Sequence, residues 1–458
     1  MQSIQKVQTP KVPCSKKHYI FKLYASQLDD GYLDRIPIFQ FILLSCLFPL
    51  WGAAASLNDI LITQFKTIFT LSNFASAFVQ SAFYGGYFII AIPASLVIKK
   101  TSYKIAILVG LLCYAIGCTL FFPASTMGTY GVFLVALFAI AIGLSFLETS
   151  ANTYSSLLGP QKTATLRLNI SQTFYPIGAA IGILLGKYLI FGAGDSLEKQ
   201  MSGLTGADRI SFGEQALQKT LLPYKYIIII LVIAIIIFAI TEFPMSKPKQ
   251  TNTQDAKISE TLSYLIKNNA YLKGIFTAFM YVGMQTAVWS FTIRLAMTLN
   301  HSINERSAST FMVFSYIAFF VGKMIANLLM DKISASKILL IFSIFGTLTI
   351  AYIMVVHNMS AVYAAIFVSG LFGPCWATIY AKTLDTVAER QHIATAGAVL
   401  VMAIIGGAVI PAIQGLAADY LGSMSYSFVV NLVCFAVVVL YAVGQVKYDR
   451  LTKEIQEG

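Results

Sequence analysis

The sequence predicts an all-α membrane protein in which twelve transmembrane helices form two pseudo-symmetric six-helix bundles. Three observations lead to this prediction. First, 57% of the 458 residues are hydrophobic and only 11% are charged, whereas soluble domains carry about a quarter charged residues. Second, the apolar residues gather in twelve stretches near the length of about 20 residues that crosses a bilayer. Third, a polar segment separates six stretches from the other six.

The predicted elements follow one another with short connections. The spans of the first bundle are 37–64, 74–98, 105–123, 130–158, 168–191 and 223–244. Those of the second bundle are 270–298, 307–330, 338–357, 360–384, 393–421 and 426–446. The expected domains are an N-terminal tail (1–36), the first bundle (37–245), a linker rich in Lys, Gln, Asn and Thr (246–269), the second bundle (270–446) and a C-terminal tail (447–458).

A weak internal repeat supports two equivalent bundles. The segment FIIAIPASLVIKKTSYK from Phe88 resembles FVGKMIANLLMDKISASK from Phe320. Each ends an apolar stretch and enters a short basic loop. Two parallel six-helix repeats around a central cavity are typical of one large class of secondary transporters. A chance likeness between two apolar helices is the alternative.

The basic residues predict the orientation. If the N-terminus is cytoplasmic, the cytoplasmic loops carry Lys99, Lys100, Lys104, Lys162, Arg167, Lys247, Lys249, Lys257, Lys267, Lys332, Lys337, Lys382 and Arg390. The short outer loops carry only Lys66 and Arg306, and the longer outer segment 192–222 mixes both signs. The positive-inside rule therefore places both termini in the cytoplasm of a multi-pass protein of the bacterial inner membrane. The net charge of +12 marks topology and predicts no nucleic acid partner.

Several function classes lack their sequence signals. The six cysteines, at positions 14, 46, 113, 118, 375 and 434, have no CxxC or zinc-like spacing, and five fall in apolar runs, so we expect reduced core residues. The four histidines do not cluster, and the chain has no P-loop, HExxH or GxSxG motif. The tail before the first span is polar, and that span is too long for a signal-peptide core. We expect no enzymatic activity, metal or cofactor, and no ATP-driven transport.

Two carboxylates lie inside predicted spans. Asp59, preceded by Asn58, lies roughly 8 Å inside the end of its span, whereas Glu148 in GLSFLETSANTY lies near the middle of the bilayer. An ionised residue at the centre of such a helix costs about 2.5 to 3.5 kcal/mol, so a retained one marks a pathway. Because burial penalises the ionised form, Glu148 is suited to proton exchange. The alternatives are that Asp59 caps the outer helix end and that Glu148 pairs with Arg294.

Amides and aromatic residues inside the spans predict a sugar site. Asn169, Gln172 and Tyr175 have the i, i+3, i+6 spacing of one helical face. Amides donate and accept hydrogen bonds together, and aromatic rings fit the apolar faces of sugars. Two further pairs have i, i+4 spacing: Gln285 with Trp289, and Trp376 with Tyr380. For these aromatic residues, packed core is the alternative. The glycines at 178, 182 and 186 predict close helix packing.

Five segments give the chain a family resemblance. NDILITQF, QSAFYGGYFIIAIPASLVIKK, GLSFLETSAN, RLNISQTF and GMQTAVWSFTIR closely resemble the L-fucose:proton symporter branch of the major facilitator superfamily, over almost the whole chain between the tails. The resemblance implies that Asp59 and Glu148 are the protonatable pair and that Gln172 contacts the sugar.

Other cavity positions depart from the fucose pattern. Ser56 stands where the family has Asn three residues before the Asp, and Tyr175 stands where Asn follows QTF. The segment close to QYPTIFS in the family reads CWATIYA from Cys375 to Ala381. Exchanging amides for a hydroxyl, a phenol and a thiol changes the shape and donor count of a pocket. We therefore expect retained coupling with a substrate other than L-fucose.

The sequence thus predicts a proton-coupled symporter that imports a small polar solute by alternating access, with a monosaccharide of the fucose/hexose class as the leading candidate. The expected substrate-binding residues are Ser56, Asn58, Asn169, Gln172, Tyr175, Gln285, Trp289, Trp376 and Tyr380. The expected partners are the sugar, the proton and the lipid bilayer, and the chain is expected to be a monomer. Sodium in place of the proton, a carrier of a non-sugar solute and a transporter-like sensor are the alternatives, and the short tails argue against the sensor.

Overall fold

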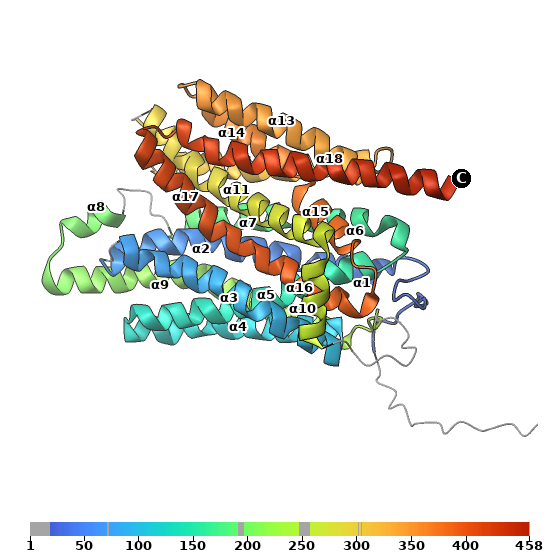
Figure 1. Cartoon of the computed structure of the whole chain (residues 1–458). Helices are drawn as coiled ribbons and strands as arrows, with labels where there is room; N and C mark the ends of the chain where they lie inside the picture. Colours follow the sequence, from blue (N-terminus) through green and yellow to red (C-terminus); the bar gives the residue numbers. More distant parts are fainter. Residues whose placement is uncertain are drawn as a thin grey trace, which may run out of the picture.

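A computed structural model describes residues 19–70, 73–190, 197–246, 257–300, 302–303 and 305–457, which are mostly helical. Figure 1 shows two groups of long, roughly aligned helices. The first bundle contains α1 (Ile38–Ser45), α2 (Phe48–Ile68), α3 (Asn73–Lys100), α4 (Tyr103–Met127), α5 (Tyr130–Leu157), α6 (Ala164–Gln172), α7 (Tyr175–Leu185), α8 (Leu197–Ser202) and α9 (Gly206–Ile240).

The second bundle follows a short helix, α10 (Ile258–Lys267). It contains α11 (Asn269–Leu299), α12 (Glu305–Met330), α13 (Ala335–Val355), α14 (Ser360–Leu371), α15 (Cys375–Leu384), α16 (Ile393–Met402), α17 (Gly406–Leu421) and α18 (Val429–Glu457). Single turns of 3-10 or π geometry are η1 (Gln161–Thr163), η2 (Gly186–Ile190), η3 (Arg390–His392), η4 (Ala403–Ile405) and η5 (Tyr426–Phe428).

Among the described residues, 11 helical segments are long and apolar enough to cross a membrane. They correspond to all the predicted spans except the seventh. That span is α11, a helix of 31 residues, which is long enough to cross a membrane. The six-plus-six helical arrangement is therefore the one that the sequence predicts.

Four of the predicted spans are each divided into two helices. Prolines explain three of the breaks, because a proline lacks the N–H that an inner helical turn needs and fits the first turn of a helix. Pro49 and Pro176 lie in the first turns of α2 and α7, and Pro374 is the N-cap of α15. The fourth break, between α16 and α17, is the 3-10 turn η4 before Gly406.

Three predicted boundaries do not coincide with helix ends. The helix of the sixth span begins at Gly206, ahead of the predicted start of the span at residue 223, because α9 continues through Pro223 for 35 residues. Membrane helices tolerate such a proline where neighbouring groups satisfy the backbone. The predicted C-terminal tail continues α18 as far as Glu457. The predicted linker contains α10, which packs on α11 and α16.

Two of the three glycines predicted for close packing, Gly178 and Gly182, have that role between α2 and α7. A methyl group at Gly178 would overlap the Pro49 carbonyl, and one at Gly182 would overlap the Ser56 hydroxyl. The prediction of a cysteine core is only partly right. Cys118, Cys375 and Cys434 are buried free thiols, Cys46 is exposed, and Cys14 lies outside the described residues.

One end of the molecule, which we call the basic end, carries Lys99, Lys100, Lys162, Lys332, Lys337 and Lys382. Figure 1 places α10 and the C-terminus at this end and α8 at the opposite end. Residues 19–36 also pack here, since Gln40 Nε2 donates to the carbonyls of Lys22 and Glu242 at 3.1 and 3.0 Å. Arg167, which the sequence assigned to a basic loop, is buried and donates to the Pro160 and Ser156 carbonyls.

Candidate functional site

Glu148 lies at the centre of the molecule. From Gly143 to Leu157 every residue of α5 is buried, and Glu148 is 7% exposed. The polar neighbours of its carboxyl group are Asn152, Tyr87 and Tyr380. The alternative of an ion pair with Arg294 is wrong, because Arg294 is exposed and lies over the Phe291 ring. Glu148 has no ion pair within the part of the chain that the structure describes.

A polar chain runs from Glu148 to the predicted sugar residue Gln172. Asn152 lies one helical turn after Glu148 on α5, and its Oδ1 accepts from Gln172 Nε2 at 2.7 Å. The Asn152 amide also interacts with the Glu148 carboxyl group. Asn152 was not among the predicted site residues. The signal was present in LETSAN, since an amide four residues after the carboxylate lies on the same helical face.

Asp59 lies in α2, nine residues before the helix ends at Ile68. At about 1.5 Å per residue this is roughly 13 Å from the end, so the alternative of an end cap does not fit. The Asp59 side chain lies outside the residues that the structure describes. Asn58 is buried, and its Oδ1 has no hydrogen-bond partner. The Ser56 hydroxyl donates to the Ala53 carbonyl at 3.1 Å and lies at the α2–α7 contact.

The predicted stripe Asn169, Gln172 and Tyr175 does not lie on one helix. The chain turns at Thr173 and Phe174, so Tyr175 begins α7 while the two amides belong to α6. Asn169 Nδ2 donates to the Thr165 carbonyl at 3.0 Å and to Thr378 Oγ1 at 3.4 Å. The structure therefore brings Gln172 toward Glu148 and Asn169 toward the second bundle.

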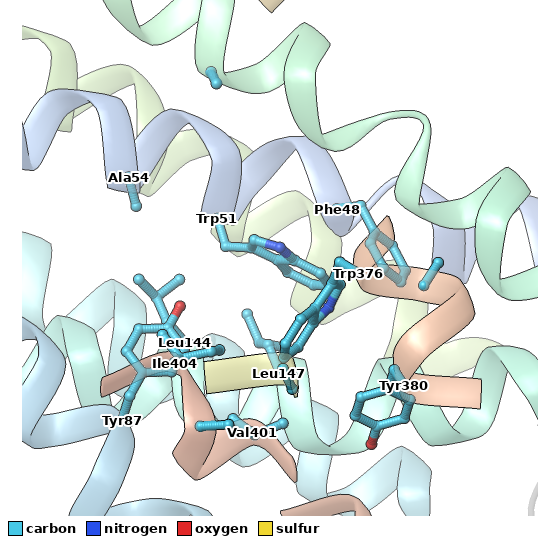
Figure 2. Packing of buried hydrophobic residues seen from close by; sticks show 14 of the residues in the cluster. Phe48, Trp51, Ala54, Tyr87, Leu144, Leu147, Trp376, Tyr380, Val401 and Ile404 are labelled. Carbon is cyan, nitrogen blue, oxygen red and sulfur yellow. The ribbon is translucent and has the colours of Figure 1, made fainter. Parts of the chain in front are cut away.

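The aromatic pairs of the second bundle differ from each other. Trp289 Nε1 donates to Ser369 Oγ at 3.1 Å, and Gln285 Nε2 donates to the Tyr281 hydroxyl at 2.8 Å. Both groups have partners inside the second bundle, as the packed-core alternative expects. Trp376 Nε1 is instead buried without a hydrogen-bond partner in the part of the chain that the structure describes. Figure 2 shows Trp376 and Tyr380 of the second bundle in the packing around Leu147 of the first.

The bundles meet along α3–α16, α5–α16, α6–α15 and α7–α12. Among the described residues, three hydrogen bonds between neutral side chains cross this seam, besides the one that Lys187 Nζ donates to Thr310 Oγ1 at 3.4 Å. They join Thr153 to Tyr380 at 2.9 Å, Asn169 to Thr378 at 3.4 Å and Thr173 to Asn327 at 2.7 Å. In the first bundle, Thr153 lies between Glu148 and the basic end. Asn169 and Thr173 lie on or directly after α6, the helix that begins at the basic end. This half of the seam is therefore closed.

A buried cation was missed by the sequence reasoning. Lys323 of α12 is 2% exposed, and its Nζ lies 4.7 Å from the centroid of the Phe319 ring. No ion pair or hydrogen bond to its ammonium group occurs among the described residues. The Phe319 ring packs edge-on against Trp289 and Tyr175 at 5.5 and 6.4 Å. The signal in the sequence was a lysine inside an apolar stretch. This stretch belongs to the internal repeat, where it resembles the end of α3.

Two six-helix bundles with buried polar groups along their shared seam are typical of secondary transporters. The chain belongs to the Major Facilitator Superfamily, whose family model matches residues 40–302 and 286–456. This confirms the resemblance that the motifs indicate.

Named relatives narrow the comparison. The chain is 32% identical over 415 residues to the L-fucose-proton symporter of Escherichia coli K12, which covers 90% of this chain and 94% of the relative. It is 31% identical over 400 residues to a glucose/galactose transporter of Brucella abortus, which covers 87% and 92%. A crystal structure of the transporter FucP in the outward conformation has a TM-score of 0.79 and 32% identity, covering 88% of this chain and 98% of that chain.

Proposed function

We propose that this protein is a proton-coupled symporter that imports a monosaccharide by alternating access, with Glu148 and Asp59 as the proton sites. The polar chain from Glu148 through Asn152 to Gln172 carries the proposal. It places a carboxyl group that lacks a cationic partner next to amides that suit sugar hydroxyls. The names of the relatives, an L-fucose-proton symporter and a glucose/galactose transporter, support the same assignment.

An unsatisfied donor near this chain supports a polyhydroxylated substrate. Among the described residues, Trp376 Nε1 is buried without a hydrogen-bond partner on α15, the helix that the Thr153–Tyr380 bond joins to α5. A buried donor without an acceptor costs about 1 to 3 kcal/mol. A sugar hydroxyl oxygen would accept from this donor, and that gain would favour the bound state.

The carboxyl group of Glu148 supplies the coupling. In its buried position the neutral acid is favoured over the carboxylate, because desolvation penalises charge. A proton taken up there crosses with a neutral sugar, so one positive charge moves per cycle. A membrane potential of 100 mV then contributes about 2.3 kcal/mol toward uptake. Asp59 is the second proton site through the family motif, and its position on α2 is away from the helix end.

For the substrate we propose a hexose rather than L-fucose. Tyr175 and Trp376 depart from the fucose pattern, while Glu148 and Gln172 keep it. A phenol and an indole offer larger apolar surfaces and fewer hydrogen-bonding groups than amides. Asn58, Asn169, Gln285 and Trp289 remain proposed cavity residues, whereas the Ser56 hydroxyl lies at the contact with Gly182.

We also propose the setting in which the carrier works. The basic end faces the cytoplasm of a bacterial inner membrane, with both termini on that side, because short cytoplasmic loops are rich in lysine and arginine. The two bundles, 37–245 and 270–446, rock about the substrate as a monomer. No enzymatic activity forms part of the proposal.

Purified protein in proteoliposomes that contain a pH-sensitive dye tests this function. D-glucose, D-galactose, L-fucose and a set of non-sugar metabolites are added outside, one at a time. Acidification of the lumen with a hexose is the expected result. Acidification with a non-sugar compound alone would overturn the sugar assignment. If calorimetry shows saturable sugar binding but the vesicles take up no radiolabelled sugar, the alternative of a transporter-like sensor is favoured.

A further inference from the structure

The hydrogen bond between Thr153 and Tyr380 joins the two bundles in the middle of the closed half of the seam. Both residues are fully buried, and the oxygens are 2.9 Å apart. Thr153 lies five residues beyond Glu148 on α5, roughly 7.5 Å nearer the basic end. The Tyr380 hydroxyl is also an electrostatic neighbour of the Glu148 carboxyl. The pair therefore lies directly beside the proposed proton site.

A third helix completes this contact. Gly397 of α16 lies against both hydroxyls, and a methyl group built on it would be 2.5 Å from Thr153 Oγ1 and 2.7 Å from the Tyr380 oxygen. Neither distance leaves room for a side chain. Glycine at this position is what allows α5, α15 and α16 to meet around the hydroxyl pair.

The seam widens from this pair toward the basic end. A cavity of about 20 Å³ follows, with Thr153, Ser156, Ala381 and Ile393 among its lining residues. A volume of this size holds about one water molecule. Beyond it lies a cavity of about 370 Å³ whose lining includes Lys162 and Lys382. The two cavities therefore lie between the hydroxyl pair and the basic end.

We propose that the Thr153–Tyr380 hydrogen bond is the latch that keeps the basic end closed, so that Tyr380 is a positioning residue of the transport cycle and not a sugar ligand. The proposal rests on the proposed function for its meaning in transport. A bond between neutral hydroxyls suits this role, because its modest net free energy lets the bundles separate once per cycle.

Cysteine accessibility tests the latch without any substrate. Ser156→Cys, on the wall of the small cavity, is introduced into a background with Cys14→Ser, Cys46→Ser and Cys113→Ser. A maleimide too large for the cavity reacts with the introduced thiol only when the seam opens. In detergent micelles the reagent reaches both ends, so the result depends neither on the orientation nor on the substrate. Failure of the proposed transport function would leave this readout unchanged.

Tyr380→Phe should raise the labelling rate about two- to tenfold, the change in open population expected when one net hydrogen bond is lost. The matched control is Tyr441→Phe. It removes a Tyr–Thr bond of the same 2.9 Å length, to Thr383, but inside the second bundle. It should leave the labelling rate unchanged. Equal rates in Tyr380→Phe and Tyr441→Phe would overturn the proposal.

Two further variants keep the test decisive if Tyr380→Phe folds poorly. Thr153→Val should reproduce the effect of Tyr380→Phe, and the double variant should label no faster than either single one. Full additivity of the two effects would contradict a direct bond between them. Gly397→Ala keeps both hydroxyls but displaces them, so it should also speed labelling. Wild-type labelling in Gly397→Ala and Thr153→Val would likewise overturn the latch.

Discussion

At the scale of single residues, Glu148 carries the most specific prediction. Glu148→Gln preserves the shape and polarity of the side chain beside Asn152 but removes the titratable group. We expect loss of uphill accumulation with sugar binding retained and no longer dependent on pH. Uptake into proteoliposomes under an imposed pH gradient measures the accumulation. Calorimetry at two pH values measures the sugar binding and its pH dependence. Accumulation against a gradient by the Gln variant would show that the coupling proton binds elsewhere.

Asp59→Asn should separate exchange from net transport. Exchange cycles the loaded carrier and does not need the proton site to empty, so counterflow of labelled sugar should persist while proton-driven uptake is lost. The control is wild-type protein assayed for both in the same vesicles. Because Asp59 lies well inside α2, wild-type uptake by the variant would leave it without a role in coupling.

Ser56 yields a prediction about packing. Its hydroxyl faces Gly182 at a contact with no spare room, so Ser56→Asn should destabilise the fold by about 1 to 3 kcal/mol through overpacking. Thermal unfolding followed by tryptophan fluorescence measures the loss. Ser211→Asn, at an exposed position of α9, is the matched control. An unchanged midpoint for Ser56→Asn would return Ser56 to the candidate sugar residues.

The sequence identified Glu148 and Gln172 because a carboxylate and an amide stand out in apolar stretches. It did not identify Asn152, whose importance depends on Gln172 reaching it from α6. Lys323 was visible in the sequence, but its lack of an anionic partner among the described residues is a property of three-dimensional packing. The importance of a residue can be predicted from its type in the sequence, whereas its hydrogen-bond and ion-pair partners can be identified only from the fold.

At the scale of elements, α10 is attached to the second bundle through a histidine. His392 Nδ1 lies 2.8 Å from Thr261 Oγ1, and its ring stacks on Tyr264 at 4.5 Å. Burial lowers the pKa of His392, with Lys99 adding to the effect and Glu389 and Glu260 opposing it. The neutral ring is therefore the form that the folded contact favours.

The sign of the pH dependence follows from that lowered pKa. The folded state binds the proton less readily than the unfolded state, whose histidine has a pKa near about 6.5. Stability of the contact is complete above that pH and is lost as pH falls through the lower folded value. Hydrogen exchange of 258–267, corrected for intrinsic rates, should quicken between pH 7.5 and pH 5.5. His392→Gln should remove this pH dependence, and an equal acceleration in that variant would exclude His392 as the cause.

The elements show why boundaries are harder to predict than spans. Hydrophobicity located every span, because crossing a membrane requires a long apolar segment. It began the sixth span at Pro223, although α9 passes through that proline. It also treated Asn169 and Tyr175 as one helical face, although a turn separates α6 from α7. The apolar pattern of the sequence indicates which residues lie in lipid. A proline that a helix tolerates and a turn between two helices both leave that pattern unchanged.

At the scale of the whole molecule, the proposed substrate site draws on both bundles. Tyr175 comes from the first bundle and Trp376 from the second, so the proposal does not assign specificity to either bundle alone. We expect L-fucose to bind at least tenfold more weakly than the preferred hexose, since a missing hydrogen-bond partner costs more than a resized apolar contact. Tyr175→Asn should narrow that difference. Calorimetric titration of the unmodified protein and of Tyr175→Asn with both sugars measures these affinities. Tight L-fucose binding by the unmodified protein would show that these positions do not set specificity.

The length of α9 has a practical consequence for imaging. A helix of 35 residues is about 52 Å long, whereas the hydrocarbon core is about 30 Å thick. Roughly 20 Å of continuous helix, carrying Asp208, Arg209, Glu214 and Lys219, therefore projects into water at the end opposite the basic end. A 50.1 kDa carrier offers electron cryomicroscopy little mass outside the detergent belt for particle alignment. A helical protein inserted between α8 and α9 would supply a fiducial mark outside the detergent belt.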